Sequence, residues 1–184
     1  DFWFGVSGKT QRLISLSDSK AFFSYTISGT RTSLTDAGTA YPADVSTATM
    51  TTFNNRLIIA VDGTSNVVKQ IDATSGFPGS NHVTDLGGSP PQASIVAKHL
   101  GRLFMNDKTN LDRLHYSETS DAEIWGGTGD SGAIDIRPGD GDPEGITAIA
   151  PFKGDLIVFK SSHIYRVLVF APETFEVTEI SKSI

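Results

Sequence analysis

The sequence of 184 residues predicts an all-β fold built from one repeated unit. The first observation is a pattern that recurs along the chain: an aromatic ring, two turn residues, a charged residue, and an apolar run that begins with leucine. The copies are FNNRLIIA (53–60), HLGRLFMN (99–106), FKGDLIVF (152–159) and a weaker TQRLISLS (10–17), which lacks the ring. Their anchoring leucines are Leu13, Leu57, Leu103 and Leu156, spaced by 44, 46 and 53 residues. Such a period indicates a repeat architecture.

The second observation is a hairpin turn at the start of each clear copy. An apolar residue (Met50, Val96 or Ile149) precedes each ring by three positions, so TATMTTF (47–53), ASIVAKH (93–99) and ITAIAPF (146–152) are expected to be strands. The turn pairs that follow are Asn54-Asn55, Leu100-Gly101 and Lys153-Gly154. Each pair ends in a residue that tolerates positive φ, as two-residue turns of the primed types require.

The third observation is that the middle strands are apolar at consecutive positions, as in LIIAV and LIVF. A strand has this composition when both faces of its sheet are covered. Small polar turns and a third strand follow each run: AFFSY (21–25), VVKQI (67–71), RLHYS (113–117) and IYRVLVF (164–170). Antiparallel sheets of about 45 residues, covered on both faces by their neighbours, predict a β-propeller-like array of blades with three to four strands. A β-sandwich of similar hairpins is the alternative.

The remaining segments complete this picture. TSDAEIW (119–125) could form one helical turn, and residues 126–145, rich in glycine and aspartate, are expected to be a loop or an extra hairpin. The last ten residues, FEVTEISKSI (175–184), are predicted to be the first strand of another blade. We therefore expect residues 1–184 to form a single propeller-like domain that is incomplete at both ends and is a fragment of a larger propeller.

Composition excludes several functional classes. The formal charge of −6 and the pI of about 5.1 provide no basic field that would attract nucleic acid or an anionic membrane. No apolar run is long enough to cross a bilayer as a helix. The chain has no cysteine, which excludes disulfides and thiolate metal sites.

Several short motifs resemble a known family. Arg102-Leu103, Tyr116-Ser117, Glu123 with Trp125, and PGDGD (138–142) occur in the order found in propeller repeats of the tail and head–tail proteins of tailed bacteriophages. That group includes the nozzle and tail-hub ("stabilisation") proteins of short-tailed phages. The resemblance covers roughly residues 45–184 and the motifs are short.

The resemblance implies a structural virion protein without catalytic activity. Its expected partners are further copies of the chain in an oligomeric ring and other tail or portal-proximal proteins, in the phage tail or at the head–tail junction. Passing DNA would be in passive contact with it, because an acidic wall repels phosphate and lets DNA slide. Two alternatives remain open: a propeller module that binds a host glycan or protein through its rim loops, and a propeller enzyme that cleaves glycans with two carboxylates.

Possible sites of chemistry each have a simpler structural interpretation. Acidic side chains gather at Asp130, Asp135, Asp140, Asp142 and Glu144, and carboxylates are the usual ligands of calcium, but the EF-hand spacing is not met. SETSDAEIWGG (117–127) is similar to the Asp-box of sialidase blades but lacks its glycine, so we expect Trp125 to pack and Asp121 and Glu123 to be exposed. GVSGKT (5–10) ends like a phosphate-binding loop, but Trp3 replaces the first glycine and a strand follows.

Histidine and arginine are expected to have structural roles. The four histidines, His82, His99, His115 and His163, are scattered over different repeats, and His99 occupies the ring position of Phe53 and Phe152. Arg12, Arg56 and Arg102 each precede an anchoring leucine, which indicates a pairing with a neighbour's carboxylate; Asp155 takes this position in the last copy. The sequence therefore predicts no catalytic, cofactor-binding or metal-ligating residues, and no cofactor.

Overall fold

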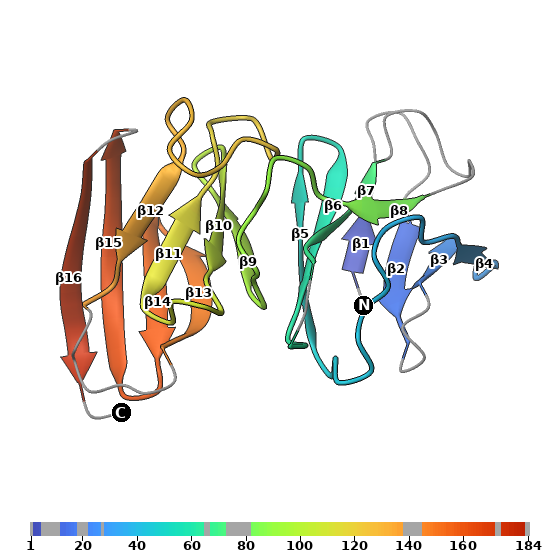
Figure 1. Ribbon diagram of the computed structural model, residues 1–184, viewed down its shortest axis with the longest axis horizontal. Helices are drawn as coiled ribbons and strands as arrows, with labels where there is room; N and C mark the ends of the chain where they lie inside the picture. Colours follow the sequence, from blue (N-terminus) through green and yellow to red (C-terminus); the bar gives the residue numbers. More distant parts are fainter. Residues whose placement is uncertain are drawn as a thin grey trace.

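Four antiparallel sheets follow one another along the chain (Figure 1). The computed structural model describes residues 2–4, 12–17, 22–26, 28–64, 67–72, 82–137, 145–171 and 174–182. Over these ranges the secondary structure consists of strands and connections, with no helix. Each sheet has four strands in sequence order, so each is a simple meander. The all-β prediction is confirmed, and the described residues form four sheets, where a single β-sandwich has two.

We name the sheets A to D in chain order. Sheet A contains β1 (Phe2–Phe4), β2 (Arg12–Leu16), β3 (Phe22–Thr26) and β4 (Arg31–Leu34). Sheet B contains β5 (Ala48–Phe53), β6 (Arg56–Val61), β7 (Lys69–Asp72) and β8 (Val83–Asp85). Sheet C contains β9 (Val96–His99), β10 (Arg102–Asn106), β11 (Arg113–Tyr116) and β12 (Gly132–Asp135). Sheet D contains β13 (Ile146–Phe152), β14 (Asp155–Lys160), β15 (His163–Ala171) and β16 (Thr174–Lys182).

The predicted turns join the first and second strands of sheets B, C and D. Both central residues have positive φ in every case: 46° and 62° at Asn54-Asn55, 45° and 75° at Leu100-Gly101, and 47° and 92° at Lys153-Gly154. Positive φ at both positions defines the type I′ turn, whose twist matches that of the flanking strands. The turn prediction is confirmed.

Each junction between consecutive sheets has its own apolar core. Leu57, Ile59 and Val61 of β6 pack towards sheet A, whereas Ile58 and Ala60 of the same strand pack towards sheet C. In β10, Leu103 and Met105 face sheet B, and Phe104 faces sheet D. Successive side chains of a strand point to opposite faces, so an uninterrupted apolar run supplies two cores. The prediction that both faces of the middle strands are covered is confirmed for LIIAV in β6, and the same holds for β10. For LIVF in β14 it is wrong, because Ile157 and Phe159 on one face are only half-buried.

This alternation gives every sheet two defined faces. We call the face that carries the anchoring leucine and the residue two places after it the back face, and the face that carries the residues one and three places after it the front face. The front face of sheets A, B and C packs on the next sheet, as Ile14, Ile58 and Phe104 show. The back face of sheets B, C and D packs on the preceding sheet, through Leu57, Leu103 and Leu156.

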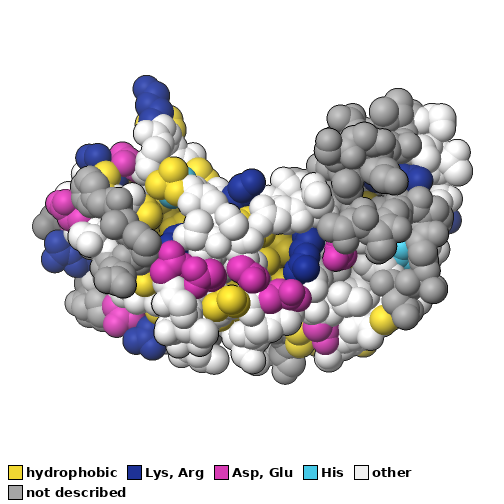
Figure 2. Space-filling view, turned by 90° about the horizontal axis from the view of Figure 1, so that it is seen from above, with side chains coloured by type: hydrophobic (Ala, Val, Ile, Leu, Met, Phe, Trp, Pro, Cys, Tyr) yellow, Lys and Arg dark blue, Asp and Glu magenta, His cyan; other side chains and the backbone are white. Residues whose placement is uncertain are grey.

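The first strands of the last three sheets are neighbours in space. β9 lies beside both β5 and β13. The hydroxyl of Thr49 in β5 donates to the Ser94 carbonyl at 3.0 Å and accepts from the Val96 amide at 3.0 Å. The row of sheets is therefore bent towards one side, and Figure 2 shows the resulting crescent with a hollow between its two ends.

The structure corrects three predictions about strand assignment. Residues 174–182 form β16, the fourth strand of sheet D, and not the first strand of another blade, because this segment pairs with β15 in an antiparallel hairpin. The region 126–145 contains β12, which completes sheet C by pairing with β11, although residues 138–144 lie outside the described residues. Residues 119–125 form a turn and bends and no helical turn.

Candidate functional site

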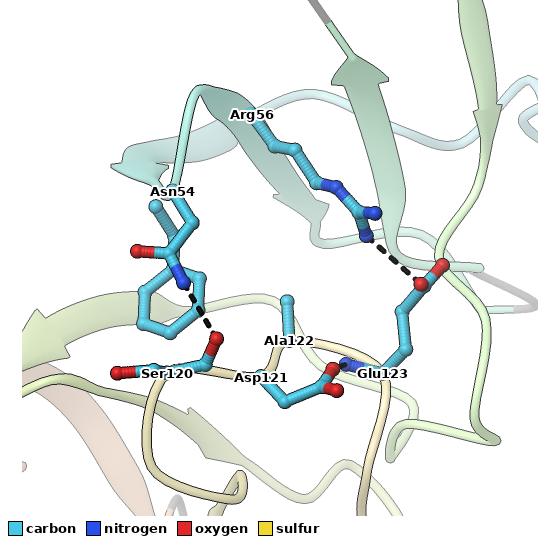
Figure 3. A pocket seen from close by; sticks show the side chains of 7 residues that line it. Asn54, Arg56, Ser120, Asp121, Ala122 and Glu123 are labelled. Carbon is cyan, nitrogen blue, oxygen red and sulfur yellow. Dashed lines mark hydrogen bonds and ion pairs between the residues drawn. The ribbon is translucent and has the colours of Figure 1, made fainter. Parts of the chain in front are cut away.

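A polar pocket of about 200 Å³ lies at the junction of sheets B and C. One wall comes from sheet B, through Phe53, Asn54 and Arg56, and the other from the β11–β12 connection, through residues 120–123. Figure 3 shows Asn54 and Arg56 pointing across the pocket towards this connection. The Asn54 side chain donates to the Ser120 carbonyl at 2.6 Å, and the Arg56 Nη1 lies 2.9 Å from Glu123 Oε2. Both contacts join the two sheets.

Glu123 is held as a carboxylate by these contacts. Besides Arg56, the side-chain amide of Gln70 donates to Glu123 Oε1 at 3.1 Å. The hydrogen bond from Arg56 lowers the pKa of Glu123, and the bond from Gln70 acts in the same direction. Asp121 also serves the local fold, because its Oδ1 accepts from the Glu123 amide at 2.8 Å.

Glu123 does not meet the requirement for the general acid of a glycosidase. A glycosidase needs a carboxylic acid whose pKa is raised so that it can protonate the leaving group. In the pocket, Arg56 has the opposite effect on Glu123. Asp121 and Glu123 are both half-buried, not exposed as predicted. The Arg56 guanidinium holds Glu123 against sheet B. Trp125 packs as predicted, with 5% of its surface exposed and its Nε1 donating to the Ala122 carbonyl.

The recurrent arginines have structural roles, in two different ways. Arg56 pairs with a carboxylate of the next sheet, which confirms the prediction for this position. Arg102 is buried and pairs instead within its own sheet, with Asp130, while its Nη1 also donates to the carbonyls of Ser117 at 2.8 Å and Asp130 at 2.7 Å. At the same position of sheet A, Arg12 is half-buried.

Two buried lysines form a further set of ion pairs that sequence reasoning missed. The Nζ of Lys69 lies 3.0 Å from Asp36 Oδ1, 3.2 Å from Asp85 Oδ1 and 4.9 Å from the centre of the Tyr41 ring. Lys160 pairs with Asp112 in the same manner, across sheets C and D. Burial raises the pKa of Asp85, but hydrogen bonds from Thr39 and Lys69 outweigh it and hold the pKa below its ordinary value. The available signal was a lysine inside the apolar strand VVKQI, because a buried lysine needs a partner.

The predicted acidic cluster is divided by other contacts. Asp130 binds Arg102 and the Thr119 amide, and Asp135 binds Arg113 with Nε 2.8 Å from Oδ1. Asp140, Asp142 and Glu144 lie outside the described residues. Among the residues that are described, no three acidic or histidine side chains are grouped so that they could hold a metal ion.

Three histidines have separate structural contacts. His99 Nε2 lies 3.0 Å from the Gly154 carbonyl in the next sheet's turn, His115 Nε2 lies 3.0 Å from Asp107 Oδ2, and the His163 ring stacks on Tyr165. The position of His99 at a packed hairpin corner is confirmed by its exposed fraction of 6%. The GVSGKT segment lies outside the described residues, and the strand expected after it is present as β2.

The largest structural difference between the sheets is the front face of sheet D. At the ring position of the repeat, Phe53 is 1% exposed and His99 6%, but Phe152 is 57% exposed. Along β14, Ile157 and Phe159 are half-buried, whereas the equivalent Ile58 and Ala60 of β6 are completely buried. This apolar front face is the clearest candidate for an interaction surface in the described part of the chain.

The comparisons with known proteins leave the family open. The chain matches no protein-family model and no curated protein. In the residues that the structure describes, no helix is long and apolar enough to span a membrane.

Proposed function

We propose that this chain is a structural virion protein of a tailed phage, part of the tail or head–tail assembly, and that it acts by oligomerisation. We propose further that its four sheets are blades of a β-propeller-like array. In this interpretation the protein positions other components and does not catalyse a reaction.

The best support for the proposal comes from the contacts made by the side chains that carry the resemblance to phage propeller repeats. Leu103, Tyr116 and Trp125 all belong to the cores between sheets, and Arg102 and Glu123 are engaged in ion pairs. Of these motif residues, Leu103, Tyr116, Glu123 and Trp125 join one sheet to the next, whereas Arg102 stabilises its own sheet. Consecutive meander sheets with first strands side by side are the arrangement of propeller blades.

The charge of the molecule suits a passive contact with DNA. The formal charge is −6, and Figure 2 shows a line of acidic side chains across the viewed face of the crescent. A wall of this sign repels phosphate and gives no counterion-release term for binding. We expect no measurable binding to duplex DNA at physiological salt in a mobility-shift assay. Tight binding would contradict a passive role.

The binding-module alternative requires exposed aromatic side chains gathered on one rim. Among the described residues, the exposed large hydrophobic side chains are Leu100, Leu111, Phe152 and Ile180. Phe152 is the only aromatic one of these, so the described residues do not form such a cluster. We therefore prefer the structural role.

The proposal is tested on virus particles. An antibody raised against the chain should label purified particles at the tail or the head–tail junction in electron microscopy. Peptide mass spectrometry should find the chain in the same particles, at a constant ratio to the other tail proteins. A chain absent from the particles, or a free monomer that hydrolyses glycans, would contradict the proposal.

A further inference from the structure

We propose that the front face of sheet D docks onto the back face of sheet A of a second copy of this chain. The inference rests on the propeller-like arrangement proposed above and not on the viral assignment. It identifies the surface through which the chain oligomerises.

The front face of sheet D has the composition of a face that is normally covered. Ile157 and Phe159 of β14 lie on it, and strand pairing adds Ile164 opposite Phe159 and Arg166 opposite Ile157. Ile157, Phe159 and Ile164 are all half-buried, and Phe152 at the end of β13 is largely exposed. Exposed apolar side chains gathered on one face, here beside the Asp155–Arg166 ion pair, commonly mark an interaction site.

The equivalent front faces show how this one would be covered. Sheet C covers the front face of sheet B through Leu103 and Met105, and sheet D covers that of sheet C through Leu156 and Val158. Each time the covering surface is a back face: the anchoring leucine and the residue two places after it. A back face is therefore the surface that fits the front face of sheet D.

Among the described residues, no other sheet covers the back face of sheet A. Leu13 and Ser15 of β2 lie on it, and register places Tyr25 opposite Leu13 and Phe23 opposite Ser15. All four are half-buried. These aliphatic and aromatic side chains match the character of the back faces that make the internal junctions.

Charge and shape favour a second copy as the occupant. Arg31 lies on the back face of sheet A, 4.7 Å above the Phe23 ring. On the front face of sheet D, Asp155 and Arg166 pair with each other, and Glu176, opposite Leu168, adds an acidic side chain of opposite charge to Arg31. Sheets A and D form the two ends of the long axis, so they do not meet within one copy (Figure 1). Two crescents joined head to tail contain eight sheets, which is within the usual range of about four to eight blades for a closed propeller.

Sedimentation velocity of the full chain over a range of concentrations tests the proposal. We expect a dimer. The substitution Ile157→Asp should raise the dimer dissociation constant on the order of 100-fold, because it places a charge in the apolar contact. Leu13→Asp on the back face of sheet A should have the same effect. Leu100→Asp is the matched control, since it makes the same kind of change at an exposed turn of sheet C and should leave the dimer intact.

Cross-linking tests the head-to-tail geometry, and the absence of native cysteine leaves no background. Mixed Ser15→Cys and Ile157→Cys variants should cross-link to each other through a short bismaleimide, and neither should cross-link to itself. A monomer at every concentration would overturn the proposal. A sheet of another polypeptide would then be the cover of the front face of sheet D. Self-linking of Ile157→Cys, or a dimer that survives Ile157→Asp, would also overturn it. None of these outcomes bears on whether the chain is found in virus particles, so the two proposals fail separately.

Discussion

The front faces of sheets B and D are built from equivalent residues of two copies of the repeat but have different surroundings. Sheet C closes the front face of sheet B, so that Phe53, Ile58 and Ala60 are completely buried and Arg56 reaches Glu123 across the junction. On sheet D the equivalent side chains are partly or largely exposed, and Asp155 takes the place of the arginine and pairs with Arg166 of its own sheet. The same pattern of residues thus stabilises the fold at one end of the molecule and remains available for a partner at the other.

We expect the largest difference between the two faces when a charge is placed at equivalent positions of each. Ile58→Asp places an unpaired carboxylate in the closed core and should lower the free energy of unfolding by more than about 4 kcal/mol, enough to unfold many domains of this size. Ile157→Asp should change it by about 1 kcal/mol or less. Urea titration at low protein concentration, where assembly does not contribute, measures both. Equal losses would mean that the two faces do not differ in burial.

Removing the aromatic ring at the same repeat position of each sheet tests the difference in burial with a milder change. Phe53→Ala should cost about 3–5 kcal/mol, because it removes a buried ring from the core between sheets B and C. Phe152→Ala, at the same position of the repeat, should cost about 1 kcal/mol or less in the dilute protein, since most of that ring is exposed. Thermal unfolding followed by circular dichroism distinguishes the two variants. A costly Phe152→Ala would show that the ring is covered by this chain.

The ion pairs of sheets B and D should differ as well, although that of Lys69 lies on the back face of sheet B. Lys69→Met removes the cation that Asp36 and Asp85 share and should cost about 2–4 kcal/mol, less than for a wholly buried pair because both carboxylates remain partly hydrated. Arg166→Met breaks the exposed pair with Asp155 and should cost about 1 kcal/mol at most. Adding Asp85→Asn to Lys69→Met should recover part of the loss in urea titrations. No recovery would mean that Lys69 acts through packing alone.

A structural feature could be predicted from the sequence when the residues that determine it are close together in the chain. The type I′ turns at Asn54-Asn55 and Lys153-Gly154 and the strands that supply two cores follow from adjacent residues, so the sequence indicated them. The pairing of β12 with β11 and the contact between Arg56 and Glu123 join segments that are separated in the chain, and no local pattern specifies them. The strand character of β16 was evident from the sequence, but not that it folds back on β15 and completes sheet D. Ile157 and Ile58 occur in nearly identical sequences, because a strand's composition shows that its face needs a cover and not whether one is present.

The smallest expected effect concerns His99, which takes the ring position between Phe53 and Phe152. Burial lowers the pKa of His99 below its ordinary value of 6.5. The unfolded chain therefore binds a proton at a higher pH than the folded chain does. The contribution of neutral His99 to stability is present above pH 6.5 and is lost as the pH falls from there towards the folded pKa.

His99→Phe should remove this pH dependence while filling the same corner as Phe53 does. At pH 7.5 the variant should match the wild type to within about 1 kcal/mol. At pH 5 it should be the more stable of the two, because below pH 6.5 the unfolded wild type gains a proton on His99 that burial disfavours in the folded chain. Urea titrations of both proteins at several pH values give the difference, in which the contributions of the carboxylates cancel. If the two stabilities ran parallel from pH 7.5 to 5, His99 would not be desolvated at this corner, and the junction of sheets C and D would be more open than that of sheets B and C.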